Sequence, residues 1–181
     1  MLRIIAGLYR HQIIEAPDVN STRPTTDKVR EAVMSALGYA ISEATILDLF
    51  AGSGALGLES LSRGAKKVYF CDNNIKAIKT IKSNINRLKI GNEAEVIFAD
   101  YLKCLNKLKD EAIKFDIVFL DPPYIKKDLY NKVVDFLFDN DMLTNDAIII
   151  KESNEKLEED QRFLKHKDYR YGTINVLIER R

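Results

Sequence analysis

The stretch Asp48-Leu49-Phe50-Ala51-Gly52-Ser53-Gly54-Ala55-Leu56-Gly57 decides the fold of this chain of 181 residues. A buried-strand pattern that begins at Thr45 runs into it, and a helical pattern leaves it at Leu56 and ends before Gly64. Its glycines match GxGxxG, a turn that joins a parallel strand to a helix. Glycines permit a tight turn and a close approach of ligand to backbone, and the helix N-terminus offers free N–H groups. The stretch therefore predicts a ligand site at the carboxyl end of a strand.

Strand-like runs alternate with helical periodicity beyond this stretch. We expect strands over residues 67–71, 94–99, 115–120 and 147–151, and helices over residues 75–88, 101–112 and 129–138. Two further strand-like runs, near 163–167 and 173–179, indicate a closing hairpin. This alternation is typical of βαβ units. The expected fold class is α/β: a mostly parallel twisted sheet with helices on both faces and a C-terminal antiparallel hairpin.

The first 40 residues are expected to form an N-terminal extension. Strand-like runs at 2–6 and 12–15 flank a turn, which predicts a short β-hairpin. A polar, proline-containing loop over 19–25 precedes a helix whose apolar residues recur from Val29 to Leu37 at helical spacing. We expect this extension, residues 1–40, to form one compact unit with the domain over residues 41–181.

The composition is 46% hydrophobic and 30% charged, with a formal net charge of +1, which is typical of a soluble globular domain. Cys71 and Cys104 form no CxxC pair, so neither a disulfide framework nor a zinc site is expected. The N-terminus lacks the long apolar segment of a signal peptide, and the longest aliphatic run, residues 147–150, is too short to span a bilayer. We expect a cytoplasmic protein with no metal and no membrane partner.

One region is strongly basic. Residues 63–89 carry eight Lys and Arg but a single acid, Asp72. Such a run is usually a solvated helix face, and the alternative is a surface that faces phosphates. The chain as a whole is nearly neutral, so no global field attracts a polyanion.

The glycine turn has two interpretations, and the acids around it separate them. Asp72 lies twenty residues after Gly52, where a dinucleotide site carries its ribose-binding acid. Asp48 lies inside the strand, where a carboxylate repels a pyrophosphate but suits a ligand with an ammonium and a sulfonium. Asp100 follows the third strand, in position to accept from an adenine amino group. These acids favour S-adenosylmethionine. The residues expected to contact it are Asp48, Phe50, Ala51, Gly52, Ser53, Gly54, Gly57, Asp72, Asn73, Asp100, Tyr101 and Asp121.

A second motif, Asp121-Pro122-Pro123-Tyr124, ends the strand over residues 115–120. It suits methyl transfer to an sp² amino nitrogen, whose lone pair is delocalised into a ring. Asp121 and the Pro122 carbonyl can accept both N–H bonds and stabilise the positive charge as it develops. Tyr124 offers an aromatic face on which an extruded base can stack, an interaction worth about 1–3 kcal/mol. Asp121, Pro122 and Tyr124 are therefore the expected catalytic residues.

With these motifs the sequence resembles the RsmD family of bacterial 16S rRNA guanine-N2 methyltransferases. The resemblance covers nearly the whole chain, and its most specific parts are residues 3–7, 22–32, 47–65 and 119–124. It implies a Rossmann-like, class I fold and methylation of one guanine N2 in small-subunit rRNA that already carries ribosomal proteins. It also implies RNA contacts by Arg3, Arg10, Arg23, Pro24, Thr25, Lys28, Arg30 and Tyr124. We expect the protein to act as a monomer.

Three other functions remain open at this point. The chain resembles amino-methyltransferases of tRNA or DNA in its motifs, although DNA enzymes carry a target-recognition domain for which little length remains. A dinucleotide-binding oxidoreductase would need a proton-transferring group, and neither His11 nor His166 follows a predicted parallel strand. A non-catalytic RNA-binding or assembly module would leave the second motif without a role.

Overall fold

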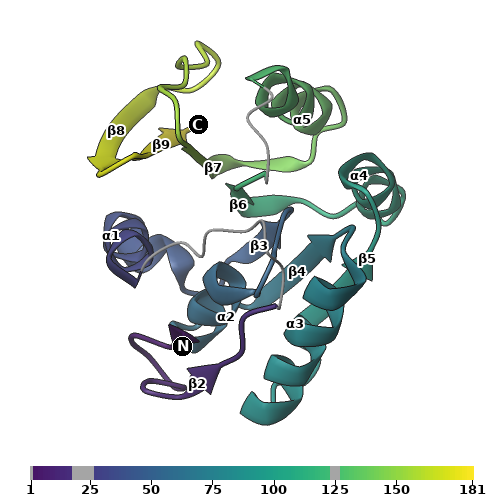
Figure 1. Ribbon diagram of the computed structural model, residues 1–181. Coiled ribbons are helices and arrows are strands. Elements are labelled where there is room, and N and C mark those ends of the chain that lie inside the picture. Colours follow the sequence, from purple (N-terminus) through teal and green to yellow (C-terminus); the bar gives the residue numbers. More distant parts are fainter. Residues whose placement is uncertain (1, 18–26, 123–126) are drawn as a thin grey trace.

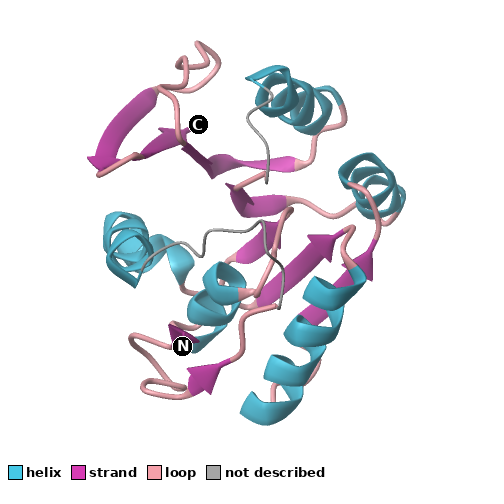
Figure 2. Ribbon diagram, in the orientation of Figure 1, coloured by secondary structure: helices cyan, strands magenta, loops and turns pink. Residues whose placement is uncertain are grey.

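The computed structural model describes residues 2–17, 27–122 and 127–181, and within these ranges it contains one large sheet and one small one (Figures 1 and 2). The strands are β1 (Leu2–Arg3), β2 (Ile13–Ile14), β3 (Thr45–Asp48), β4 (Lys67–Asp72), β5 (Ala94–Phe98), β6 (Phe115–Leu120), β7 (Leu143–Ser153), β8 (Lys165–Tyr171) and β9 (Ile174–Arg180). The helices are α1 (Asp27–Leu37), the 3-10 helix η1 (Gly38–Ile41), α2 (Ala55–Ser62), α3 (Ile75–Leu88), α4 (Tyr101–Asp110) and α5 (Lys127–Asp139).

The large sheet has the strand order β5-β4-β3-β6-β7-β9-β8. Strands β3 to β7 are parallel, and β9 is antiparallel to both of its neighbours, β7 and β8. The expected α/β fold and C-terminal hairpin are therefore confirmed. From β3 the chain winds outward through β4 to β5 and then returns to the other side of β3 as β6. Such a reversal is a topological switch point, where ligands bind at the carboxyl ends of the strands.

Helices cover both faces of the sheet because side chains alternate along each strand. Ile46 and Phe70 belong to one buried cluster with apolar residues of α1, α2 and α3. Their direct neighbours in the two strands, Leu47 in β3 and Tyr69 in β4, belong to a second cluster with residues of α4 and α5. Both faces of the central strands are thus buried, which explains their continuous apolar runs.

The N-terminal hairpin joins the first of these clusters. Strands β1 and β2 pair antiparallel, and Leu2, Ile4 and Ile14 are buried together with residues of α1, α2 and the sheet. The hairpin approaches α2 so closely that a Cβ on Gly7 would lie 1.8 Å from the backbone oxygen of Ser62. Where it is described, the extension therefore shares a hydrophobic core with the rest of the chain.

Strand β7 is longer than its sequence pattern indicated. It begins at Leu143, whereas the apolar run begins only at Ala147. Its pairing with β6 shifts register between Phe115 and Ile117, and the polar residues before Ala147 occupy this irregular part. A pattern based on alternation misses such a segment because a bulge breaks the period.

The two cysteines are distant in sequence but neighbours in the fold. Both are buried, and contact with the Cys104 side chain, together with burial, raises the pKa of the Cys71 thiol. In the described ranges no helix is long and apolar enough to cross a membrane, and no three His, Cys, Asp or Glu side chains gather in a group that could hold a metal ion.

Candidate functional site

Four strands end on an aspartate or are followed closely by one, and these strands are successive neighbours in the sheet, with the switch point between β3 and β6. Asp48 is the last residue of β3, and Asp72 is the last residue of β4. Asp100 comes just after β5, and Asp121 directly follows β6. The backbone N–H of Leu49 donates to the Phe119 carbonyl at 3.2 Å, which keeps the chain beyond β3 beside β6. The fold therefore brings the two sequence motifs to one edge of the sheet.

The glycine turn between β3 and α2 adopts a backbone that requires glycine. Gly52 and Gly54 have φ angles of +55° and +76°, in the left-handed region that side chains rarely adopt. The Gly54 N–H donates to the Ala51 carbonyl at 2.6 Å, and the Ala51 N–H donates to the Cys71 carbonyl at 2.9 Å. Gly57 is needed for a different reason, since a Cβ there would lie 2.2 Å from Cε1 of Phe70. The turn is thus held against β4.

Asp72 fixes the shape of this turn. Its Oδ2 accepts from the N–H of Gly52 at 2.9 Å, and its Oδ1 accepts from the N–H of Asn74 at 2.8 Å. The side chain is half-buried, and a carboxylate has about four lone-pair positions, so each oxygen can accept a further hydrogen bond. The neighbouring Asn73 is exposed. Asp72 can therefore hold the turn and still accept from ligand hydroxyls, the role expected for it.

Asp48 has the most perturbed environment of the four acids. Its side chain is buried, and its Oδ2 accepts from the N–H of Gly57 at 3.2 Å. Burial raises its pKa to about 7; the Gly57 hydrogen bond opposes this rise, while the charges of Asp121 and Asp72 add to it. A buried carboxylate near other carboxylates is stabilised in its ionised form by a nearby cation.

The segment after β5 combines a helix cap with an aromatic pair. Oδ1 of Asp100 accepts from the N–H groups of Leu102 and Lys103 at 3.1 and 3.0 Å, which caps α4. Both bonds lower the pKa of the half-buried Asp100 carboxyl, and the bond from Lys103 has the larger effect. The rings of Phe50 and Tyr101, both expected ligand contacts, lie 6.3 Å apart between centroids. Asp100 thus has a structural role, and its Oδ2 faces solvent and the Lys103 ammonium at 3.5 Å.

Only the first half of the second motif lies in the described residues. Asp121 is half-buried and Pro122 is buried, whereas Pro123 and Tyr124 lie outside the described residues. A residue that the pattern did not indicate, Tyr130 of α5, lies in the vicinity of Asp121. Its hydroxyl donates to the Glu152 carbonyl at 2.5 Å, and burial, followed by the Asp121 charge, raises its pKa.

The residues expected to contact RNA differ in their positions. Arg3, Arg10 and Lys28 are exposed, whereas Arg23, Pro24 and Thr25 lie outside the described residues.

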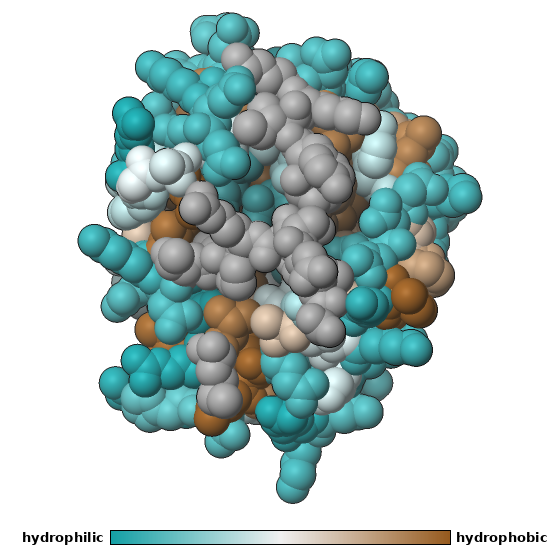
Figure 3. All heavy atoms as spheres, viewed as in Figure 1, coloured by the Kyte–Doolittle hydropathy of each residue, from teal (hydrophilic) through white to brown (hydrophobic). Residues whose placement is uncertain are grey.

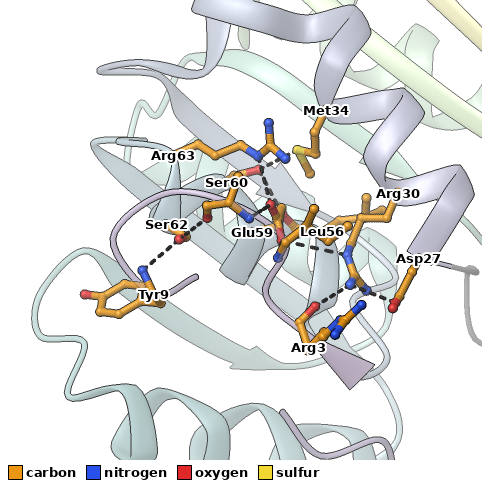
Figure 4. A network of polar contacts seen from close by, with 12 residues as sticks. Arg3, Tyr9, Asp27, Arg30, Met34, Leu56, Glu59, Ser60, Ser62 and Arg63 are labelled. Atoms are coloured by element: carbon orange, nitrogen blue, oxygen red, sulfur yellow. Dashed lines mark hydrogen bonds and ion pairs between the residues drawn. The ribbon is translucent and has the colours of Figure 1, made fainter. Parts of the chain in front are cut away.

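For Arg30 the expectation was wrong, because its side chain has no exposed surface. Its guanidinium donates to the Arg3 carbonyl at 2.5 Å and to Asp27 Oδ1 at 3.0 Å, and it lies 3.9 Å from Glu59 Oε2 (Figure 4). This arginine joins α1 to the hairpin and to α2, and it cannot reach a phosphate from there.

Sequence reasoning missed two buried polar residues that hold the surroundings of the site. Asn84 of α3 donates from Nδ2 to the carbonyls of Glu15 and Ser53 at 3.0 and 3.2 Å, and its Oδ1 accepts from the Glu15 N–H at 2.8 Å. Glu59 of α2 accepts from backbone groups of the hairpin. The sequence does contain a sign of both residues, because each is a polar residue on an otherwise apolar helix face. Asn84 lies among isoleucines and Glu59 lies among leucines.

A concavity of about 390 Å³ lies at the opposite edge of the sheet, and so it is separate from the four aspartates. It is lined by Thr45, Lys66, Lys67, Tyr69, Ala112, Ile113 and Lys114. Thr45 and Lys67 are the first residues of β3 and β4, whereas the candidate site surrounds the last ones.

Comparisons with known proteins agree with the fold and the motifs. A family model described as conserved hypothetical protein 95 matches residues 2–180. Ribosomal RNA small subunit methyltransferase D of Escherichia coli K12 is 38% identical over 152 residues, which cover 84% of this chain and 74% of that protein. The protein of the same name from Haemophilus influenzae is 39% identical over 153 residues, covering 84% and 78%. A solved structure of a hypothetical protein from Thermus thermophilus has a TM-score of 0.83 and 25% identity, covering 99% of each chain. This chain therefore belongs to the conserved hypothetical protein 95 family, the RsmD family that its motifs resemble.

Proposed function

We propose that this protein transfers a methyl group from S-adenosylmethionine to the N2 amino group of a guanine in 16S rRNA of the small ribosomal subunit. The observation that carries the proposal is the adjacency of Asp48 and Asp121 at the ends of paired strands, beside the glycine turn. The relatives named small subunit methyltransferase D support rRNA as the substrate class.

The polar groups around the turn fit S-adenosylmethionine better than a dinucleotide. The charges of Asp72 and Asp121 already raise the pKa of Asp48, so a ligand with an ammonium and a sulfonium relieves this repulsion, whereas a pyrophosphate increases it. In dinucleotide sites the N–H groups at the helix start receive the phosphates. Here the Gly57 N–H at the start of α2 donates to Asp48 instead. A Cβ at Gly52 would meet no heavy atom within 4 Å, so this side of the turn is open to a ligand.

We assign the parts of the ligand to the residues that suit them chemically. Asp48 and the turn would hold the cationic amino-acid end, and Asp72 would accept from the ribose hydroxyls. Phe50 and Tyr101 would flank the adenine, with Asp100 as acceptor for its amino group. Bound in this way, S-adenosylmethionine supplies an electrophilic methyl group on a sulfonium.

Asp121 and Pro122 would act on the base. A guanine amino nitrogen is a weak nucleophile because its lone pair is delocalised into the ring. Two acceptors, the Asp121 carboxylate and the Pro122 carbonyl, would bind its two N–H bonds and orient the lone pair. They would stabilise the positive charge on nitrogen as it develops. As the N–C bond forms, the bond between the methyl and the sulfonium would break and S-adenosylhomocysteine would leave, and the methylated nitrogen would release one proton to the Asp121 carboxylate or to water. Correct positioning of the two reactants supplies much of the remaining acceleration.

The test is methyl transfer from labelled S-adenosylmethionine, followed by nucleoside analysis. The substrates are small subunits from cells that lack the endogenous enzyme, with naked rRNA, tRNA and duplex DNA in parallel and Asp121→Asn as the inactive control. We expect N2-methylguanosine in the subunit sample. Label in another nucleoside or in another nucleic acid would overturn the substrate assignment but keep the chemistry. No label with any substrate, while S-adenosylmethionine still binds, would favour a non-catalytic RNA-binding module.

A further inference from the structure

Helix α3 exposes a face that is basic along its whole length. In Ile75–Leu88 the chain contains four Lys and Arg and no acid. Lys76, Lys79, Lys82 and Arg87 are exposed, and at 3.6 residues per turn they share one side of the helix. The opposite side carries Ile78, Ile81, Asn84 and Leu88, all of which are buried.

The lysines of α4 provide a comparison within the same molecule. Lys107 bonds to both Glu95 and Glu111, at 2.9 and 2.7 Å, and Lys109 lies 3.5 Å from Asp110. Lys103 lies 3.5 Å from Asp100. Each lysine of α4 is thus close to a carboxylate, as in an ordinary solvated helix with interspersed charges.

Two of the four positive charges of α3 lack such a carboxylate among the residues that the structure describes. Arg87 forms an ion pair with Glu15. Lys79 and Lys82 form no ion pair with any residue that the structure describes, although both side chains are exposed. Exposed like charges on one helix face repel each other, and a polyanion removes this repulsion.

The position of α3 connects this face to the candidate site. The N-cap of the helix is Asn74, whose N–H donates to the Asp72 side chain. The start of α3 therefore lies at the same edge of the sheet as the four aspartates. In its C-terminal half the helix contacts the N-terminal hairpin and the residue that follows it, since Asn84 bonds to Glu15 and Arg87 bonds to the Ile13 carbonyl. Figure 1 shows α3 beside α2 and β2, and Figure 3 shows a largely hydrophilic surface in this region.

We propose that the exposed face of α3 formed by Lys76, Lys79 and Lys82, the α3 basic face, binds the phosphate backbone of the RNA whose base enters the site. This inference rests on the proposed function, since it names the docking surface for that substrate. Phosphate contacts position a protein on nucleic acid without reading its sequence. A local basic face suits a nearly neutral protein, because the contact is made where the substrate lies and not over the whole surface.

The test compares two double variants that each remove two positive charges. K79Q/K82Q neutralises the α3 basic face, and K107Q/K109Q neutralises paired lysines on α4 as the matched control. Both pairs lie on the surface, where ion pairs contribute only about 0–1 kcal/mol, so both variants should fold with a thermal midpoint close to that of the parent. The readouts are the affinity for a naked 16S rRNA transcript at several salt concentrations, the KM for small subunits, and the affinity for S-adenosylmethionine.

For K79Q/K82Q at low salt, we expect the affinity for rRNA to fall about tenfold and the KM for small subunits to rise about tenfold. The affinity for S-adenosylmethionine should be unchanged. The slope of log affinity against log salt should fall by about 1.4–1.8, the value for two lost phosphate contacts. The α4 control should stay within about twofold of the parent, since its lysines contact carboxylates.

Equal losses in both variants would overturn the inference, because they would reflect net charge alone. A rise in KM for small subunits with no loss of affinity for naked rRNA would also overturn the inference, because the α3 basic face would then contact a ribosomal protein. Binding is measured without turnover, so a parent protein that binds rRNA through α3 but methylates nothing would refute the proposed function and leave the docking surface standing.

Discussion

The Oδ2 atom of Asp48 accepts a hydrogen bond from the backbone N–H of Gly57 at 3.2 Å, across the glycine turn. The bond joins the last residue of β3 to the first turn of α2. Because the carboxylate is buried beside other acids, its pKa is raised to about 7. The site therefore contains an acid that changes its charge near neutral pH.

We expect binding of S-adenosylmethionine to strengthen as pH rises through about 7, because only ionised Asp48 attracts the ligand's cationic groups. A ligand that binds only the ionised form should bind about tenfold more weakly near pH 6 than near pH 8. Asp48→Asn should bind weakly and lose this dependence. Calorimetric titration over this pH range measures it, and an affinity in the parent protein that does not vary with pH would contradict the assignment of Asp48.

The same raised pKa predicts how stability varies with pH. The pKa of Asp48 is higher in the folded protein than in the unfolded chain, so the folded state holds the proton more tightly between about pH 4 and pH 7. The contribution of this group is fully present below the unfolded pKa and is lost as pH rises through about 7. In urea unfolding without ligand, Asp48→Asn should therefore gain stability over the parent protein above pH 7 and much less near pH 4.

Asp72 and Asp121 should separate binding from chemistry. Asp72→Ala removes the acceptor for the Gly52 and Asn74 N–H groups as well as the expected ribose contact, so affinity for S-adenosylmethionine should fall by about tenfold or more. Asp121→Asn should change that affinity by no more than a few-fold, because it removes only one of several carboxylates near the ligand's cationic groups. It should lower the rate of methyl transfer by about 10²-fold or more, since the Asp121 carboxylate also acts on the base. The reverse pattern, measured by ligand titration and single-turnover assay, would show that the two roles are exchanged.

Sequence patterns predicted the parts of this molecule that depend on local spacing. The strand–helix alternation, the glycine turn and the order of Asp48, Asp72, Asp100 and Asp121 along the chain are local features, and parallel strands bring their carboxyl ends to one edge. The fold class and the grouping of these acids therefore followed from the sequence, together with the family resemblance.

Contacts between distant segments were not predictable in this way. Arginine is a residue type that commonly contacts RNA, but Arg30 is buried against Glu59 because α1 and the hairpin both pack on α2. Asn84 bonds to a residue 69 positions away in the sequence. A single sequence shows that such a polar residue interrupts an apolar face, but it does not name the partner.

Gly57→Ala should destabilise the protein through overpacking. The new Cβ would lie 2.2 and 2.7 Å from Cε1 and Cζ of Phe70 and 2.8 Å from Cγ1 of Val68, so α2 must move away from β4. Such insertions cost about 1–3 kcal/mol. Gly91→Ala is the control, since its Cβ would meet only the flexible end of Glu93 at 3.2 Å. Urea unfolding of both variants measures the difference, and equal midpoints would show that helix α2 adjusts without cost.

Glu59→Gln should loosen the N-terminal hairpin without changing the size of the side chain. Oε2 of Glu59 accepts from the N–H of Ile5 at 2.8 Å, and Oε1 accepts from the N–H of Ala6 at 3.0 Å. Oε1 also accepts from Nε of Arg63 at 2.8 Å (Figure 4). A glutamine amide has a single acceptor oxygen, so its NH₂ group must face one of these donors, in a place where no surface is exposed. Breaking such a buried contact costs about 2–4 kcal/mol. Hydrogen exchange at Ile5 and Ala6 should speed up more than exchange in the sheet, whereas the exposed Glu31→Gln should change neither. Uniform acceleration across the whole chain would mean that the network stabilises the fold globally and does not anchor the hairpin in particular.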